Sequence, residues 1–306
     1  MERVLTFLLA LAMTLGGYAA RVEGDAKAAE LLAQARAAIG GDKPLGKVQA
    51  VSCVGSIQRS IGDRQVSGEL TLDLQLPDKM LRTESISPMG DGALVINEQG
   101  LNGDVLLRNT RVTNAPPGMF LRTPPVPPPG SDAEAQAIRN SRAELARLAV
   151  SLLLASPGSL PLEFVYGGEA ESPDGKADVL DVKGAGSFAA RLFFDKETHR
   201  PLMLGYRGVS PRMIVQTQRV QGPPPARGGS QPEPPAGRGD HGGPGAEPPV
   251  PEIVDITMFF DDYRAVDGVM LPHHISRAVG GQTNEEWTFR SIKVNPAFKP
   301  ETFRAR

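Results

Sequence analysis

Apolar and polar residues alternate strictly along residues 66–76 of this chain. Position by position, Val66, Gly68, Leu70, Leu72, Leu74 and Leu76 alternate with Ser67, Glu69, Thr71, Asp73 and Gln75. Because successive side chains of a strand point to opposite faces, the pattern predicts a strand with one apolar and one solvated face. Gly, Asp and Pro residues separate it from other short extended segments, which we place at residues 48–57, 80–86, 92–97 and 105–107.

The second half of the chain repeats this organisation. Its predicted strands cover residues 162–166, 179–182, 190–194, 201–206, 213–220 and 253–260. Further on, Asp267 and Gly268 form the dipeptide that is typical of a two-residue hairpin turn, and alternating segments continue on both sides of it up to Pro296. We therefore expect an antiparallel meander at the C-terminal end.

Two segments have helical periodicity. The first covers residues 25–39 and ends at two glycines, with apolar residues three and four positions apart at Ala28, Leu31, Leu32, Ala35 and Ile39. The second begins at the capping box of Ser131 and Glu134, carries a stripe of Leu and Ala residues, and stops before Pro157. We expect both helices to cover the apolar face of the sheet, the second as core packing or as a gating element.

The N-terminal residues 1–20 are expected to be a cleaved signal peptide. An apolar run over residues 4–15 follows Arg3, and it is shorter than the about 20 residues that span a bilayer. An uncleaved anchor is the alternative. No cysteine follows the run as an acceptor for a lipid, so we expect a soluble protein of the bacterial periplasm. The one cysteine, Cys53, lies in a strand pattern, where a small buried apolar role is favoured over a nucleophile.

Residues 21–306 are interpreted as a single domain with an insertion at residues 222–251. That segment consists mainly of Pro and Gly with Arg, Glu and Ser. It cannot bury enough apolar surface to offset its ordering entropy, so we expect a disordered loop at the tip of a hairpin.

The charge balance argues against nucleic-acid binding. Lys and Arg number 33 against 35 for Asp and Glu, which gives a formal net charge of −2. Binding to phosphates without regard to sequence requires a dense cationic stripe, and the basic residues here are scattered.

Residues with catalytic potential do not form a recognisable pattern. His273 and His274 are adjacent, and on a strand they point to opposite faces, so they are poorly placed to bind one metal ion. The acidic residues Asp261, Asp262 and Asp267 lie near the two histidines in sequence. Those that invite a paired-carboxylate interpretation are Asp261, Asp262, Glu285 and Glu286. Such residues next to turns more often solvate a sheet edge, and the common hydrolase, zinc, phosphate-loop and dinucleotide motifs are absent. We expect no catalytic residues, no metal and no cofactor.

A binding surface remains as the main expectation. Many strands with one apolar face, together with two helices, predict a sheet curled around a concave apolar surface suited to acyl chains or apolar peptides. The candidate lining residues are Leu70, Leu72, Leu74, Ile256, Met258 and Phe260. From the residues alone, a concavity simply plugged by the helices is an equal alternative.

Several segments resemble one known family. They are the first helix ending at residues 39–41, the strand pair over residues 68–84, the turn at residues 102–104, and the C-terminal segment from residue 262 to Pro296. Together they are similar to the LolA/LolB-like superfamily of outer-membrane lipoprotein-sorting proteins. The resemblance implies an incomplete, strongly curved antiparallel barrel lidded by helices, whose interior holds lipoprotein acyl chains. It also implies a polar strand residue at Arg82, which we add to the candidate binding residues.

We therefore expect an α+β fold, in which two helices lid the concave face of a strongly curved antiparallel sheet. The expected function is non-catalytic binding of the acyl chains of a lipid or lipoprotein. A regulatory, sensor or scaffold protein of the envelope that binds a protein partner is the first alternative. A hydrolase using Asp261, Asp262 and His273 is the second.

Overall fold

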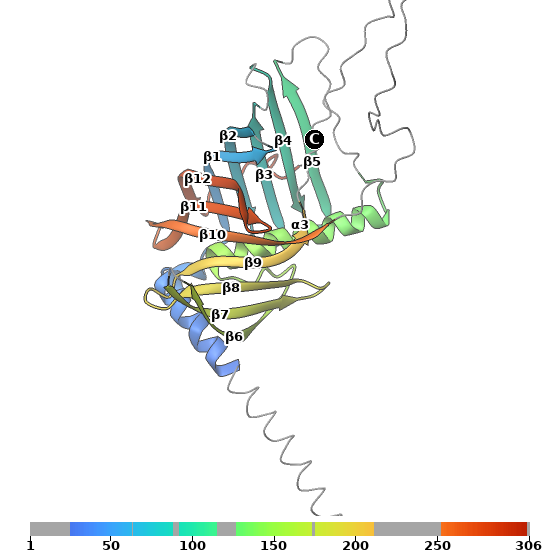
Figure 1. Cartoon of the computed structure of the whole chain (residues 1–306). Helices are drawn as coiled ribbons and strands as arrows, with labels where there is room; N and C mark the ends of the chain where they lie inside the picture. Colours follow the sequence, from blue (N-terminus) through green and yellow to red (C-terminus); the bar gives the residue numbers. More distant parts are fainter. Residues whose placement is uncertain are drawn as a thin grey trace, which may run out of the picture.

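A computed structural model describes residues 25–62, 64–87, 92–114, 127–172, 175–210 and 252–304. Within these ranges the chain forms one antiparallel sheet of twelve strands in the order β5-β4-β3-β2-β1-β12-β11-β10-β9-β8-β7-β6 (Figure 1). The strands are β1 Ala50–Ile61, β2 Arg64–Gln75, β3 Lys79–Ile86, β4 Leu94–Asn102, β5 Val105–Thr113, β6 Leu162–Ser172, β7 Gly175–Gly184, β8 Ala189–Asp195, β9 Pro201–Val209, β10 Ile253–Val266, β11 Val269–Val279 and β12 Gln282–Val294. The predicted signal peptide and the predicted strand at residues 213–220 lie outside the described residues.

The sheet consists of two meanders joined in the middle. Strands β1 to β5 follow one another, as do β6 to β12, and β1 pairs with β12 in antiparallel register. β5 and β6 lie at opposite edges of the sheet and do not pair, so the sheet is open. The expectation of an α+β fold with a strongly curved sheet therefore needs correction: the fold is mostly β, and the sheet twists but is not strongly curled. Alternation along a strand predicts its two faces, whereas curvature depends on bulges and twist that alternation does not encode.

The clearest sequence signals are confirmed. The inward residues Leu70, Leu72 and Leu74 of β2 are each 1% exposed, as the alternation predicted. Asp267 and Gly268 have φ of 49° and 84° between β10 and β11. Positive φ at both central residues is the geometry of the hairpin turn that Asp-Gly favours.

The hairpin of β4 and β5 is longer than the sequence predicted. The two strands pair from Leu94 with Thr113 to Asn102 with Val105, whereas the alternation indicated only residues 92–97 and 105–107. Exposed polar residues interrupt the strands, for example Gln99 opposite Arg108. Because apolar residues no longer alternate there, the periodicity ends before the strands do.

The two predicted helices form where the periodicity placed them. The first helix covers residues 25–38, and the short helix α2 Asp42–Leu45 follows it. The long α3 Asp132–Leu153 begins at Ser131, whose side chain accepts a hydrogen bond from the backbone amide of Glu134 at 3.2 Å. The carboxylate of Glu134 reaches back to the amide of Gly130 at 2.6 Å, so the predicted cap is confirmed, with its return bond one residue earlier than in the usual capping box.

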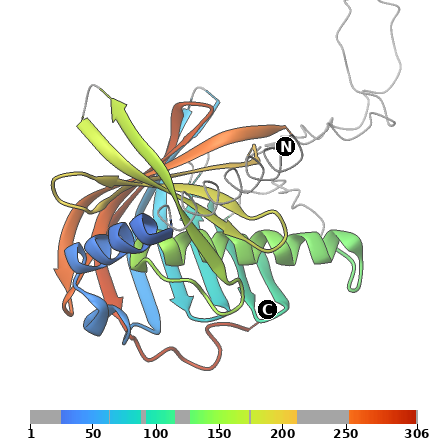
Figure 2. The same ribbon diagram turned by 90° about the horizontal axis from the view of Figure 1, so that it is seen from below.

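Both helices lie against the same face of the sheet (Figure 2). Their buried residues belong to one apolar core together with the inward residues of the strands, for example Leu31, Leu148, Leu72 and Met258. Arg36 of the first helix donates a 2.9 Å hydrogen bond from Nη1 to the carbonyl of Leu154 at the end of α3. The helices therefore form one layer over the sheet.

The residues that flank the Pro- and Gly-rich segment lie on two paired strands. β9 and β10 are antiparallel neighbours, with Val209 opposite Ile253, and the amide of Ser210 donates to the carbonyl of Glu252 at 2.8 Å. Residues 211–251, which connect these two positions, lie outside the described residues. The disorder expected for residues 222–251 stays a prediction.

Candidate functional site

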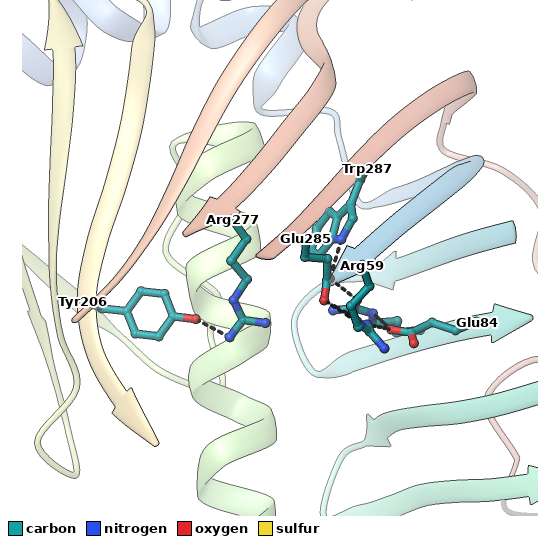
Figure 3. Close-up of polar contacts among 7 residues, drawn as sticks. Arg59, Glu84, Tyr206, Arg277, Glu285 and Trp287 are labelled. Carbon is teal, nitrogen blue, oxygen red and sulfur yellow. Dashed lines mark hydrogen bonds and ion pairs between the residues drawn. The ribbon is translucent and has the colours of Figure 1, made fainter. Parts of the chain in front are cut away.

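Charged side chains meet on the face of the sheet that the helices cover. Arg59 comes from β1, Arg82 and Glu84 from β3, and Glu285 from β12 (Figure 3). Each stands at an inward position, because the side chains two residues away are core residues such as Ile57. We call these four residues the ionic quartet.

Ion pairs join all members of the ionic quartet. Arg59 donates from Nε to Glu285 and from Nη2 to Glu84, both at 2.9 Å. Arg82 pairs with Glu84 at 2.5 Å and also with Glu285. Glu84 and Glu285 are only 6% and 5% exposed. Two arginines thus balance two glutamates, which is the condition under which buried charges are tolerated.

Trp287 forms the apolar wall of the ionic quartet. Its indole Nε1 donates a hydrogen bond to Glu285, and the guanidinium of Arg82 lies 4.6 Å from the centroid of its ring. Trp287 itself is 1% exposed and stands opposite Ile57 and Ile275 on the neighbouring strands. Cation–π contact and the indole hydrogen bond together hold Arg82 and Glu285 against the core.

The pKa of Glu285 shows that its charge is held by its partners. Burial alone would raise this pKa, but Arg82, Arg59 and Arg277 outweigh burial and lower it from 4.5 to about 2. Burial would lower the pKa of Arg82, but the carboxylates of Glu285, Glu84 and Glu144 outweigh burial and raise it. Both residues are therefore ionised at every physiological pH.

A second polar group lies next to the ionic quartet, between the sheet and α3. Arg277 of β11 donates from Nη2 to the hydroxyl of Tyr206 of β9 at 3.0 Å (Figure 3). Arg147 of α3 stacks over the ring of Tyr206 at 4.0 Å and donates from Nη1 to Glu144 at 3.2 Å. Although burial would raise the pKa of Glu144, Arg277, Arg147 and Arg82 lower it. We call Glu144, Arg147, Tyr206 and Arg277 the α3 group.

The predicted ligand residues all face the helices but do not form one compact site. Leu70, Leu72 and Leu74 lie on β2, whereas Ile256, Met258 and Phe260 lie on β10, and β1, β12 and β11 separate the two strands. Each of the six is at most 5% exposed. Arg82 joins the first set as the register partner of Leu72. Whether they contact a ligand stays a prediction.

The apolar face is filled in this structure. Leu145, Leu148 and Leu152 of α3 are at most 1% exposed and belong to the same core as the strand residues. A shallow hollow of about 360 Å³ at Pro161, Leu162, Glu163, Lys183 and Gly184 lies at the edge formed by β6 and β7 and contains none of the predicted residues. A ligand reaches the apolar face only if a helix moves away from it.

The residues considered for hydrolysis lie on β10 to β12 but do not assemble. His273 is 6% exposed and its Nδ1 lies 3.2 Å from the carbonyl of Leu271, while His274 faces the other side of β11. Asp262 is bound by the guanidinium of Arg264. Glu285 belongs to the ionic quartet, whereas Glu286 stands on the opposite face of β12. Among the described residues no three His, Cys, Asp or Glu side chains could hold a metal ion together.

Sequence reasoning missed the ionic quartet and the α3 group. A signal for them was present in β3. Met80, Arg82, Glu84 and Ile86 occupy alternate positions of this strand, so their side chains lie on one face. Two charged residues within an apolar row predict a buried ion pair. Their partners Arg59 and Glu285 are 226 residues apart, so the pairing itself depends on the register of β1 with β12.

Known proteins resemble this chain in structure but not in sequence. No family model and no curated protein matches it. Solved structures with a similar arrangement include a LolA superfamily protein from Nitrosomonas europaea, with 10% identity, 90% of this chain and 97% of that one covered, and a TM-score of 0.44. A lipoprotein-sorting protein domain from Vibrio parahaemolyticus matches with 10% identity, coverage of 92% and 97%, and a TM-score of 0.43.

A protein of the DUF1329 family from Desulfovibrio piger is similar to the same degree, with 8% identity, coverage of 90% and 97%, and a TM-score of 0.42. Two of these structures are named for the lipoprotein-sorting superfamily that the sequence resembles. Similarity at this level assigns no function to the chain. In the described part of the chain, no helix has the length and apolar character needed to cross a bilayer.

Proposed function

We propose that this protein is a non-catalytic binding protein of the bacterial periplasm that holds an apolar ligand between its sheet and α3. The ligand class that fits is the acyl chain of a lipid or lipoprotein, because the covered face presents aliphatic and aromatic side chains over most of its area. The predicted signal peptide at residues 1–20 supports export to the periplasm.

One observation carries the proposal: the apolar face of the sheet is covered by helices and not by a second sheet. The sheet is held together by hydrogen bonds between its own strands, and α3 contributes to none of these ladders. α3 can therefore move without breaking the pairing of any strand. Displacing it would expose Leu72, Met258 and their neighbours as a continuous apolar surface, which an acyl chain would cover in its place.

Polar contacts at the surface fasten α3 over the sheet. Arg142 of α3 pairs with Asp104 in the turn between β4 and β5, and the side chain of Asp104 is 78% exposed. Ser159, which follows the helix, donates from its hydroxyl to the carbonyl of Pro77 at 2.6 Å. Exposed ion pairs contribute at most about 1 kcal/mol each, so these contacts position α3 without fixing it.

A cleavable tether between α3 and the sheet tests this proposal. In the double variant Arg142→Cys and Asp104→Cys, the two thiols lie within reach of a disulfide-containing bis-maleimide, while Cys53 is 1% exposed and protected from the reagent. We expect the tethered protein to bind a fluorescent fatty acid about tenfold or more weakly, with recovery after reductive cleavage.

The single variant Arg142→Cys, treated with the same reagent, is the matched control because it carries the modification without the tether. It should bind like the untreated protein. Equal binding by tethered and cleaved protein would show that α3 does not have to move, and the proposed site beneath it would be wrong.

A further inference from the structure

The two polar groups beneath α3 differ in their charge balance. In the ionic quartet, Arg59 and Arg82 face Glu84 and Glu285, so positive and negative charges cancel. In the α3 group, Arg147 and Arg277 face the single carboxylate of Glu144. The α3 group therefore carries one positive charge more than its carboxylate neutralises.

The geometry of the α3 group leaves hydrogen-bond donors without acceptors. The Nε atoms of Arg147 and Arg277 are buried, and neither has a hydrogen-bond partner among the described residues. The hydroxyl of Tyr206 accepts its hydrogen bond from Arg277, so its own proton remains to be donated. Burial, followed by the neighbouring Glu144, raises the pKa of Tyr206, which keeps this proton in place. A buried donor without an acceptor is costly, so an acceptor is expected to complete the group.

An oxyanion fits this set of donors. Guanidinium groups bind the oxygens of carboxylates and phosphates through paired N–H donors, and charge-assisted hydrogen bonds of this kind are stronger than neutral ones. The residues on the strands next to these donors are apolar. Met258 is the register partner of Arg277, Ile256 is the partner of Tyr206, and Leu204 lies opposite Met258. A ligand bound here has its charged group on the α3 group and its apolar part on β9 and β10.

We infer that Arg147, Arg277 and Tyr206 bind the single anionic group, carboxylate or phosphate, of an acyl ligand whose hydrocarbon chain lies on the adjacent apolar face. This inference rests on the proposed function and adds its headgroup specificity. The protein is then a binder of acidic lipids and discriminates against neutral ones of the same chain length.

The test compares a fatty acid with its own ester. The fluorescent parinaric acid and its methyl ester share one hydrocarbon chain and differ in the charge of the terminal group. We expect the full-length protein to bind the acid about tenfold more tightly than the ester, the effect of one or two charge-assisted hydrogen bonds. In Arg277→Gln the two affinities should become nearly equal, because the acid loses more binding energy than the ester.

Two further variants keep the outcome interpretable. Arg207→Gln removes an exposed arginine from the residue next to Tyr206 and should keep the full preference for the acid. Tyr206→Phe removes only the hydroxyl and should reduce the preference about threefold. An unchanged circular dichroism spectrum shows in each case that the variant is folded.

Competition separates the two sources of the anionic group. Oleate and oleoyl lysophosphatidate are used to displace parinaric acid, and the one that acts at the lower concentration identifies carboxylate or phosphate as the preferred group. Equal binding of acid and ester by the unmodified protein, or a preference that persists in Arg277→Gln, would overturn the inference and leave the proposed function standing. Binding of neither probe would overturn both.

Discussion

Arg59 and Glu285 stand directly opposite each other on β1 and β12, and Arg59 Nε donates a hydrogen bond to Glu285 at 2.9 Å. This pair lies at the junction where the two meanders of the sheet meet. It therefore links residues of the first and last strands of the chain, on the face that α3 covers. Charged pairs at such a junction favour one register of β1 against β12, because a slip of one strand by one residue would turn its charged side chain to the other face, away from its partner.

Replacing Glu285 tests how strongly the stability of the fold depends on the ionic quartet. In Glu285→Gln, Arg59 and Arg82 keep one carboxylate, Glu84, between them, and a buried positive charge loses its partner. We expect the free energy of unfolding at pH 7 to fall by about 3–5 kcal/mol. Chemical denaturation followed by circular dichroism measures the change.

Asp262→Asn is the matched control for this substitution. Asp262 is paired with Arg264 at the surface, and its φ of 52° is one that Asn also adopts. The expected loss there is much smaller, because an exposed ion pair contributes little to stability. Similar losses of stability in the two variants would show that the buried ionic quartet contributes no more to stability than an exposed ion pair does.

Acid should remove the contribution of Glu285 within a defined range of pH. Its pKa lies at about 2 in the folded protein, against an ordinary value of 4.5. A carboxyl group whose pKa is lowered by folding stabilises the folded state above its unfolded pKa, and this stabilisation disappears as pH falls through the folded pKa. The difference between the two values corresponds to about 3 kcal/mol.

The stability difference between the unmodified protein and Glu285→Gln should therefore be constant above about pH 5 and shrink as the pH falls toward about 2. Denaturation curves for both proteins at a series of pH values check this. A difference that stays the same at pH 3 and pH 7 would contradict the assignment of the low pKa to Glu285.

Two adjacent glycines should respond differently to substitution. Gly40 and Gly41, after the first helix, have φ of 130° and 86°, values that side chains disfavour. A Cβ on Gly40 would lie 2.4 Å from the carbonyl oxygen of Gly268, whereas one on Gly41 would meet nothing within 4 Å. Next to this contact, the amide of Met270 donates to the carbonyl of Ile39 at 2.9 Å.

We expect Gly41→Ala to lower stability by about 1 kcal/mol through backbone strain alone, and Gly40→Ala to cost about 2 kcal/mol more because the helix end must move off the β10–β11 hairpin. Thermal unfolding of the two variants measures the difference directly. If both melted at the same temperature, the close packing of the helix end on the hairpin would be disproved.

Local signals in the sequence predicted the elements, and long-range pairing decided the site. The alternation of β2, the cap at Ser131 and the Asp267-Gly268 turn each depend on residues close in sequence, and each was correct. The β4–β5 hairpin was underestimated because exposed polar residues such as Gln99 interrupt the apolar pattern. Helix placement over the sheet followed from amphipathicity, since an apolar stripe must be covered.

The candidate site could not be predicted from short stretches of the sequence, because its residues come from distant parts of the chain. Glu285 next to Glu286 suggested a solvated acidic pair, and only the register of β12 shows that Glu285 meets Arg59 inside the protein. The α3 group likewise joins Arg147 of a helix to Arg277 of a distant strand around Tyr206. The curvature of the sheet was overestimated because it follows from twist and bulges along many strands.

The most direct test of the account uses Trp287, the one tryptophan of the chain, which lies on the covered face and is 1% exposed. Bromine atoms quench tryptophan fluorescence only at short range, so dibrominated stearate reports whether an acyl chain enters beneath α3. We predict saturable quenching of Trp287 that unbrominated stearate reverses, and loss of that quenching when Arg142→Cys and Asp104→Cys are tethered. Unchanged Trp287 fluorescence at concentrations of dibrominated stearate that displace bound parinaric acid would place the ligand elsewhere and contradict the account.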